Sequence, residues 1–419
     1  MKKAVFLTAV SGLALIASGS MAQTIDNNFA RDRGTSVTER ARAEYAPLGL
    51  RLGAFMANTT VETSVGYTDN LYYNNARKES DASLGVRPQV DVSSTWSRHA
   101  VSFGAGSDIV SYSGNGDENT TSWNAYLRGR VDVSSAATIA ASFSHNRNYE
   151  SRSSFQASLT SLEPVPYDID AASITTTIVG NRLRFMGTLS STTEDYKNVA
   201  RIGGGIIDNS ARDAKVNVVA GRVDYAVSPS VSVFVNAESN ERNYDSNPSY
   251  NNKGTILTLG SSFEITGLSR GELQVGRQKQ DYKAATAGDQ STTYINGKVE
   301  WFPTQLTSVT GKIERNVTDT PNISGPNVSA VYTATSIGVD HELLRNVLLL
   351  AEYQHTAYDF SGINRSDKGD RLTLGGRYYM SRRISLDAAY RYENYKSSGT
   401  QAFRDFTNNW IRLGLTWRY

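Results

Sequence analysis

The chain has 419 residues, a length that suits a large barrel or two ordinary domains. It holds 43 Lys and Arg against 41 Asp and Glu, and loss of an export signal carrying Lys2 and Lys3 would leave 41 of each, which excludes a protein that binds nucleic acid through a basic face. The absence of Cys excludes disulfide frameworks, cysteine-ligated zinc, Fe–S clusters and thiol catalysis.

Residues 1–22 have the features of an export signal. Lys2 and Lys3 precede an apolar run over residues 4–17, and Ser20 to Ala22 form a small-residue cleavage site. No later stretch approaches the roughly 20 apolar residues that a spanning helix needs. We therefore expect a mature chain that is either soluble outside the cytoplasm or a β-barrel in an outer membrane.

Residues 23–52 form a leader ahead of the first predicted strand. The leader is too polar to be a strand in lipid, since it carries Arg33, Glu39, Arg40, Arg42, Glu44 and Arg51. Two interpretations remain open: a periplasmic tail that docks an inner assembly, or a segment folded into the lumen as a plug.

From Gly53 onward, segments of roughly ten residues carry apolar side chains at every second position. One example sets Ile295, Gly297, Val299 and Trp301 against Asn296, Lys298 and Glu300. A period of two indicates strands with one apolar and one polar face. In the segment near residue 220 the register stays open, because either Val216 and Val218 or Val219 and Val223 could face outward.

Eighteen such segments fill residues 53–419. Their spacing of about 20 residues per strand and connection is typical of a transmembrane barrel. The predicted centres lie near residues 63, 88, 105, 127, 141, 177, 187, 220, 235, 260, 275, 297, 310, 335, 351, 375, 388 and 413.

The connections alternate between short and long. Short ones include 95–98, 134–137, 180–182, 228–230, 266–269, 303–305 and 381–383, and long polar ones include 70–81, 146–170, 194–213, 316–329 and 359–370. This alternation predicts one rim of tight periplasmic turns and one rim of extracellular loops. With an even number of strands, both termini are expected at the periplasmic rim.

The last segment is the clearest single strand. Ile411, Leu413, Leu415, Trp417 and Tyr419 share one face, and the strand ends the chain on an aromatic residue. Such an ending resembles the signal that the bacterial barrel-insertion machinery recognises. We expect Leu413, Leu415, Trp417 and Tyr419 to serve as that assembly signal.

Several motifs resemble a known family, the putative β-barrel porins found in exopolysaccharide gene clusters of alphaproteobacteria. They are RARAEYAPLGLRLGAF at 40–55, TDNLY at 68–72, WSRH at 96–99, WFPTQLT at 301–307 and VDHELLRN at 339–346. The resemblance implies an outer-membrane barrel associated with polysaccharide secretion or with cell-surface glycan.

Catalysis is not expected. Ser144 and His145 are adjacent on a strand, so they point to opposite faces and cannot act as a nucleophile and its base. His99 falls beside a predicted turn, where it fits a hydrogen-bonding rim residue. We expect neither an enzyme nor a bound cofactor or metal.

The predicted inward faces combine charged and aromatic side chains. Rings beside hydrogen-bonding groups suit sugars, which present both CH faces and hydroxyls, although inward tyrosines could equally fill space. The candidate lumen residues are Tyr126, Arg128, Arg130, Tyr294, Lys298, Glu300, Arg377, Tyr379, Asp387 and Arg391.

The sequence thus predicts an all-β, antiparallel outer-membrane barrel of about 18 strands. The favoured function is a passive conduit or accessory in exopolysaccharide export. The alternatives are a general diffusion porin and a non-conducting surface anchor or adhesin that binds glycan through its loops. Expected partners are outer-membrane lipid, lipopolysaccharide, the barrel-insertion machinery and polysaccharide-export components.

Overall fold

A computed structural model describes residues 29, 34–283, 289–321 and 329–419. The signal peptide expected at 1–22 and most of the leader before Gly34 lie outside the described residues.

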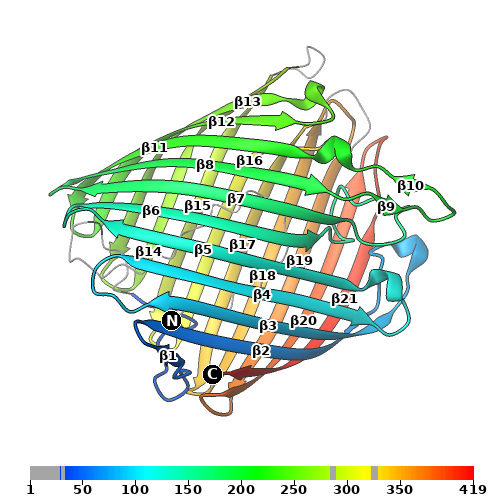
Figure 1. Cartoon of the computed structure of the whole chain (residues 1–419). Helices are drawn as coiled ribbons and strands as arrows, with labels where there is room; N and C mark the ends of the chain where they lie inside the picture. Colours follow the sequence, from blue (N-terminus) through cyan, green and yellow to red (C-terminus); the bar gives the residue numbers. More distant parts are fainter. Residues whose placement is uncertain (1–28, 30–33, 284–288, 322–328) are drawn as a thin grey trace.

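Eighteen strands form a closed antiparallel barrel in which each strand pairs with its neighbours in chain order (Figure 1). Every predicted strand centre falls inside one of them, which confirms the predicted architecture. The strands are β2 (Phe55–Thr68), β3 (Asp81–Ser94), β4 (Ala100–Tyr112), β5 (Thr120–Asp132), β6 (Ala137–Tyr149), β7 (Pro166–Val179), β8 (Leu183–Tyr196), β11 (Ala214–Ser228), β12 (Val231–Tyr244), β13 (Asn252–Ile265), β14 (Ser269–Tyr282), β15 (Gln290–Thr304), β16 (Thr307–Asp319), β17 (Ser329–Leu344), β18 (Val347–Ser361), β19 (Ser366–Tyr379), β20 (Ile384–Ser398) and β21 (Phe406–Arg418).

The remaining elements are short. A three-residue strand, β1 (Leu50–Leu52), pairs with the start of β2, and β9 (Val199–Ala200) and β10 (Ile206–Ile207) form a small hairpin in the connection after β8. Single 3₁₀ turns lie in four connections: η1 (Asn75–Arg77), η2 (Gly116–Glu118), η3 (Ser210–Arg212) and η4 (Pro248–Tyr250). Among the described residues, no helix is long and apolar enough to cross a membrane.

The barrel closes where β21 meets β2. The two strands pair from Thr60 with Arg418 to Thr68 with Trp410. Beyond this ladder, the backbones of Thr59 and Tyr419 exchange two hydrogen bonds of 3.0 and 3.2 Å. Closure gives every strand two partners, which a sheet in lipid requires because no water can satisfy an unpaired edge.

The two faces of the wall show the polarity of a membrane barrel. Outward side chains are apolar and accessible, as for Leu259 at 62% exposure, whereas the inward Asp224 and Ser232 are fully buried. The open register near residue 220 is resolved as well: Val219 and Val223 face outward, and Val216 is buried inside. The outer face of the wall is apolar and the inner face is polar. This arrangement is typical of a barrel that sits in a bilayer and encloses a hydrated lumen.

The strands are longer than the sequence predicted, with 13–16 residues instead of about ten. The connection expected over 359–370 is therefore only 362–365. Apolar alternation stops early because the ends near the long loops carry outward polar pairs, such as His145 with Asp170 at 2.8 Å.

Short turns occupy one rim and long connections the other, as predicted (Figure 1). The turn residues His99 and Thr266 adopt left-handed backbones, with φ of 63° and 53°. Tyr419 ends at the short-turn rim, next to the turn that holds Arg383, whose carbonyl accepts the Arg418 amide. The location of the C-terminus at this rim follows from an even number of strands.

Deleting Trp417 to Tyr419 should prevent assembly, because the closing ladder would lose its last pairs with β2 and β20. We expect degraded or aggregated protein and no heat-modifiable band in the outer-membrane fraction. A three-residue deletion at Gly203–Gly205, in the connection after β8, is the control and should assemble normally. Wild-type membrane levels of the C-terminal deletion would refute this role of the last strand.

Candidate functional site: the lumen and its two ends

Residues 34–49, here called the leader segment, dock on the inner wall beside the short turns. The Gly34 amide donates to Glu264 Oε1 and the Val37 amide to Ser308 Oγ, both at 2.6 Å. Arg270 returns a hydrogen bond from Nη1 to the Gly34 carbonyl at 2.7 Å. Since the wall residues all occupy inward positions, this part of the leader lies in the lumen.

One buried carboxylate binds the leader segment electrostatically. Glu342 of β17 is 8% exposed and receives Arg42 Nη2 at 2.8 Å and Arg40 Nη1 at 3.4 Å. Arg40 also donates to the carbonyl of Gln305 in the turn before β16. A carboxylate between two guanidiniums fixes the leader near the turn rim, because either charge left alone there would be poorly solvated.

Further contacts extend the leader segment along the wall. Arg270 forms ion pairs with Glu39 of the leader and, at 2.6 Å, with Glu300 of β15. Tyr45 stacks on Tyr379 with ring centroids 5.9 Å apart. The leader therefore covers the inner surface from β13 to β19 and narrows this end of the lumen.

At the opposite rim, residues 150–165, here called the mouth loop, cross the opening. Gln156 donates to the Asp319 carbonyl at the end of β16, which lies eight strands around the barrel from β6. Phe155 is buried in a cluster with Tyr395 and Phe406, and its carbonyl accepts a hydrogen bond from Arg365 at 3.1 Å. The long connection predicted over 146–170 spans 150–165 and folds inward across the opening.

Buried arginines hold the mouth loop in place. Arg152, 9% exposed, reaches Glu118 of η2 with Nε at 3.0 Å. Arg212 of η3 makes a bidentate pair with Glu150 at 2.8 and 3.1 Å. These pairs are desolvated, so losing either partner would be costly.

Arg404, in the connection before β21, binds backbone rather than a carboxylate. Its guanidinium donates to the carbonyls of Arg152 and Ser154, the latter at 3.1 Å. Burial lowers the pKa of Arg404 to about 10; nearby Tyr395 opposes this effect and Arg152 adds to it. Arg404 still carries its charge at neutral pH, and it fixes the backbone of the mouth loop.

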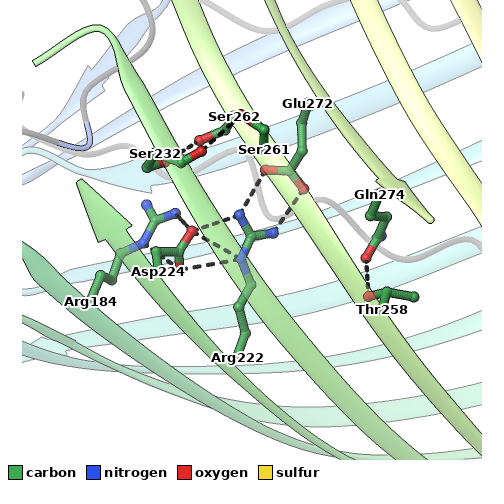
Figure 2. A network of polar contacts seen from close by, with 9 residues as sticks. All are labelled: Arg184, Arg222, Asp224, Ser232, Thr258, Ser261, Ser262, Glu272 and Gln274. Atoms are coloured by element: carbon green, nitrogen blue, oxygen red, sulfur yellow. Dashed lines mark hydrogen bonds and ion pairs between the residues drawn. The ribbon is translucent and has the colours of Figure 1, made fainter. Parts of the chain in front are cut away.

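Between the two ends, the inner wall carries compensated charges. Figure 2 shows Arg222 bound to both Glu272 and Asp224, with Arg184 on the other side of Asp224. The Arg222 bonds to Glu272 are both 2.8 Å. Such pairing leaves local dipoles on the inner wall with little net charge.

A similar chain of charges crosses the closure between β21 and β2. Glu62 of β2 binds Arg412 of β21 and, at 3.0 Å, Arg87 of β3. Arg87 continues to Asp108 of β4 at 2.8 Å.

All ten candidate lumen residues occupy inward positions, but they do not form one group. Arg128 lies over the Tyr126 ring at 4.7 Å, and the Tyr126 hydroxyl donates to Asp91. Tyr294 faces inward opposite Gly276. Arg391 stacks on Trp410, and Tyr379 contacts Tyr45 of the leader segment. Ion pairs hold the other five candidates: Arg130, Lys298, Glu300, Arg377 and Asp387.

Sequence reasoning missed three features of this site. Trp410 faces inward with Arg391 over its ring at 4.5 Å, and the alternation of β21 could have revealed it. The roles of Glu342 and of Gln156 had no local signal, because their partners lie far away in the chain.

The residues tested for catalysis are separated. Ser144 faces the lumen, whereas His145 faces outward, pairs with Asp170 and packs against Trp123 with ring centroids 4.6 Å apart. His99 exchanges hydrogen bonds with Asp132 beside a turn. Within the described ranges, no group of three His, Asp or Glu residues could hold a metal ion.

A closed barrel with an apolar exterior, a charged inner wall and inward-folded segments at both ends defines an outer-membrane channel protein of the porin type. The family described as "Putative beta-barrel porin 2" matches residues 42–419, and the chain belongs to this family. No curated protein matches it significantly.

Several solved structures resemble this chain at low sequence identity, among them the outer membrane protein OpdK. OpdK from Pseudomonas aeruginosa shares 12% identity over 87% of this chain and 99% of its own, with a TM-score of 0.45. OccAB2 from Acinetobacter baumannii shares 12% over 87% and 98%, with a TM-score of 0.46. OprD from Pseudomonas aeruginosa shares 11% over 87% and 95%, with a TM-score of 0.45.

Replacing Glu342 with Gln should release the leader segment, because Arg40 and Arg42 would lose their shared counter-charge at a cost of about 3 kcal/mol. We expect faster trypsin cleavage after these arginines, followed by mass spectrometry, and a higher single-channel conductance.

The matched control is Glu352→Gln. Glu352 faces inward on the neighbouring strand, but its pair with Lys312 is 3.7 Å long and half exposed, so it should contribute about 0.2–1 kcal/mol. Equal leader protection in Glu342→Gln and Glu352→Gln would contradict the docking role of Glu342.

Proposed function

We propose that this chain is a passive, cofactor-free channel for saccharide chains that acts in exopolysaccharide export. The observation that carries the proposal is the composition of the inner wall. Aromatic rings with a guanidinium over one face lie there beside ion pairs. Tyr126 with Arg128 and Trp410 with Arg391 each offer a flat apolar surface bordered by hydrogen-bond donors. A sugar can stack its CH face on such a ring while its hydroxyls bond the neighbouring groups.

The pairing of the lumen charges supports the same proposal. Arg184 and Arg222 together neutralise Asp224 and Glu272, so a neutral chain can pass without drawing counter-ions and without being trapped by a strong field. The barrel of 18 strands is wide enough for an aqueous channel when its end segments leave room.

A channel for small polar solutes is the second candidate, and the mouth loop favours it. The loop crosses the opening and is anchored by the desolvated pairs Arg152–Glu118 and Arg212–Glu150. A fixed crossing narrows the pore, which selects small solutes unless the loop is displaced during transport.

Replacing Tyr126 and Trp410 with Ala should weaken the block of single-channel current by maltose-series oligosaccharides about tenfold, because stacking on one ring contributes roughly 0.5–1.5 kcal/mol. Small-ion conductance should stay unchanged or rise. Planar-bilayer recordings measure both, and secreted polysaccharide is assayed in parallel in cells.

Tyr126→Phe with Trp410→Phe is the control, since it keeps a ring at each position and should retain most of the block. Two results together would contradict the saccharide proposal: a channel current that oligosaccharides do not block, and normal polysaccharide secretion in cells that lack the protein. The channel for small polar solutes would then be the function.

We also propose that the long connections face outward from the cell and that Tyr419 lies on the periplasmic side. The exposed Gly203–Gly205 stretch suits a topology test because all three glycines have positive φ and open space around them. An epitope inserted there should be labelled on intact cells, whereas one in the turn 134–136 should be labelled only after lysis. The reverse pattern would invert the orientation.

A further inference from the structure

On the strands of the barrel, outward charged side chains lie towards one rim only. In the strand halves nearest the short turns, the outward positions that the structure describes hold no Asp, Glu, Lys or Arg. In the halves nearest the long connections, charged side chains point outward from most strands between β6 and β20, from Arg147 to Lys396. The two membrane boundaries therefore present different chemistry.

The length of the strands explains where these charges lie. A 14-residue strand such as β14 is about 46 Å long, and a tilt of about 40° gives it a height of about 35 Å, against an apolar band of about 25 Å. Lys368 and Lys396 lie eleven and twelve residues from the short-turn ends of their strands, beyond an apolar band that begins at those ends. Arg277 and Arg315 lie eight residues from those ends, in the upper part of the band. An outward charge costs about 2–4 kcal/mol at the midplane and about 0–1 kcal/mol near the headgroups.

Two outward arginines in this belt bind hydroxyls rather than carboxylates. Arg277 of β14 donates from Nε to Ser291 Oγ at 2.8 Å, and Arg315 of β16 donates from Nη1 to Thr333 Oγ1 at 2.7 Å. Across the described ranges, neither guanidinium has a carboxylate within ion-pair distance. Both positive charges remain uncompensated by the protein.

Two lysines continue the same surface. Lys368 of β19 and Lys396 of β20 are exposed and stand directly opposite each other. They lie in one pairing row with Arg315, separated from it by the small side chains of Thr333 and Ala357. Like charges directly opposite in a sheet are destabilising unless an anion lies between them.

The neighbouring carboxylates are already engaged. Asp370 accepts hydrogen bonds from the Tyr353 hydroxyl at 2.7 Å and pairs with His355 at 2.8 Å. Asp359 accepts from Ser366 at 3.1 Å. Hydrogen bonds from hydroxyl groups do not cancel the charge of a carboxylate, but the four cations, here called the basic row, outnumber Asp359 and Asp370 and form a net positive strip above an apolar surface.

We propose that the basic row, Arg277, Arg315, Lys368 and Lys396, binds the phosphate groups of a phosphorylated glycolipid in the outer leaflet. Guanidinium and ammonium groups supply the charge that phosphate requires, and Thr333 and Ala357 leave room for a bulky headgroup. The apolar side chains below the row receive the acyl chains, so one lipid meets both surfaces. This proposal rests on the proposed orientation of the long connections and does not depend on what passes through the lumen.

The test adds bis-phosphorylated lipid A to the purified, detergent-solubilised protein and follows bound lipid by native mass spectrometry. Wild-type protein should retain lipid through the washes. Replacing all four residues of the basic row with Gln should weaken binding about a hundredfold or more, because each cation near an anionic headgroup contributes about fivefold.

The matched control is Lys253→Gln with Lys279→Gln, two cations of the same belt that already pair with Glu241, Asp281 and Asp289. It should bind within about fivefold of wild type. Folding of each variant is checked by heat-modifiability on gels, and Arg277→Lys with Arg315→Lys should keep most of the affinity.

Two further ligands separate the sources of phosphate. Dephosphorylated lipid A should bind wild type and variants equally weakly, and inorganic phosphate alone should not displace the lipid. Equal binding of both lipids by wild type, or full binding by the folded four-residue variant, would overturn the proposal. Displacement by inorganic phosphate would replace the lipid with a free anion as the occupant.

Discussion

The whole structure depends on a closed backbone ladder. In hydrocarbon, an unpaired amide or carbonyl has no water to bond, so a sheet survives only without edges. The pairing of β2 with β21, completed by Thr59 and Tyr419, removes the last edge. Because the backbone groups are all paired within the wall, the side chains do not have to satisfy them. The side chains can therefore alternate between lipid and lumen, and the lumen contacts described below follow from this alternation.

The lumen follows a second rule, that enclosed charges need partners. Arg222 of β11 pairs with Asp224 of the same strand and with Glu272 of β14, and Glu62 of β2 pairs with Arg87 and Arg412 of the two adjacent strands. The wall is consequently polar and structured but nearly neutral at short range. Where a guanidinium stacks on a ring, as Arg391 does on Trp410, the wall also offers an apolar surface.

The same chemistry narrows both ends of the channel. At the short-turn end, Glu342 forms ion pairs with two arginines of the leader segment. At the other end, Arg365 and Arg404 donate hydrogen bonds to carbonyls of the mouth loop. Charge-assisted hydrogen bonds are short and strong. They fix the two segments that define the ends of the channel.

The sequence by itself determined what is local: the period of two gave the strands, their number, their faces and the alternation of short and long connections. It predicted the inward positions of Tyr126 and Arg391 because a side chain's face follows from its place in a strand. Only the tertiary structure decided that Gln156 reaches Asp319 and that Arg42 reaches Glu342, since these contacts join residues 163 and 300 positions apart. Alternation carries no information on such distant pairs; they depend on the curvature and register of the closed wall, which bring opposite strands to the same lumen.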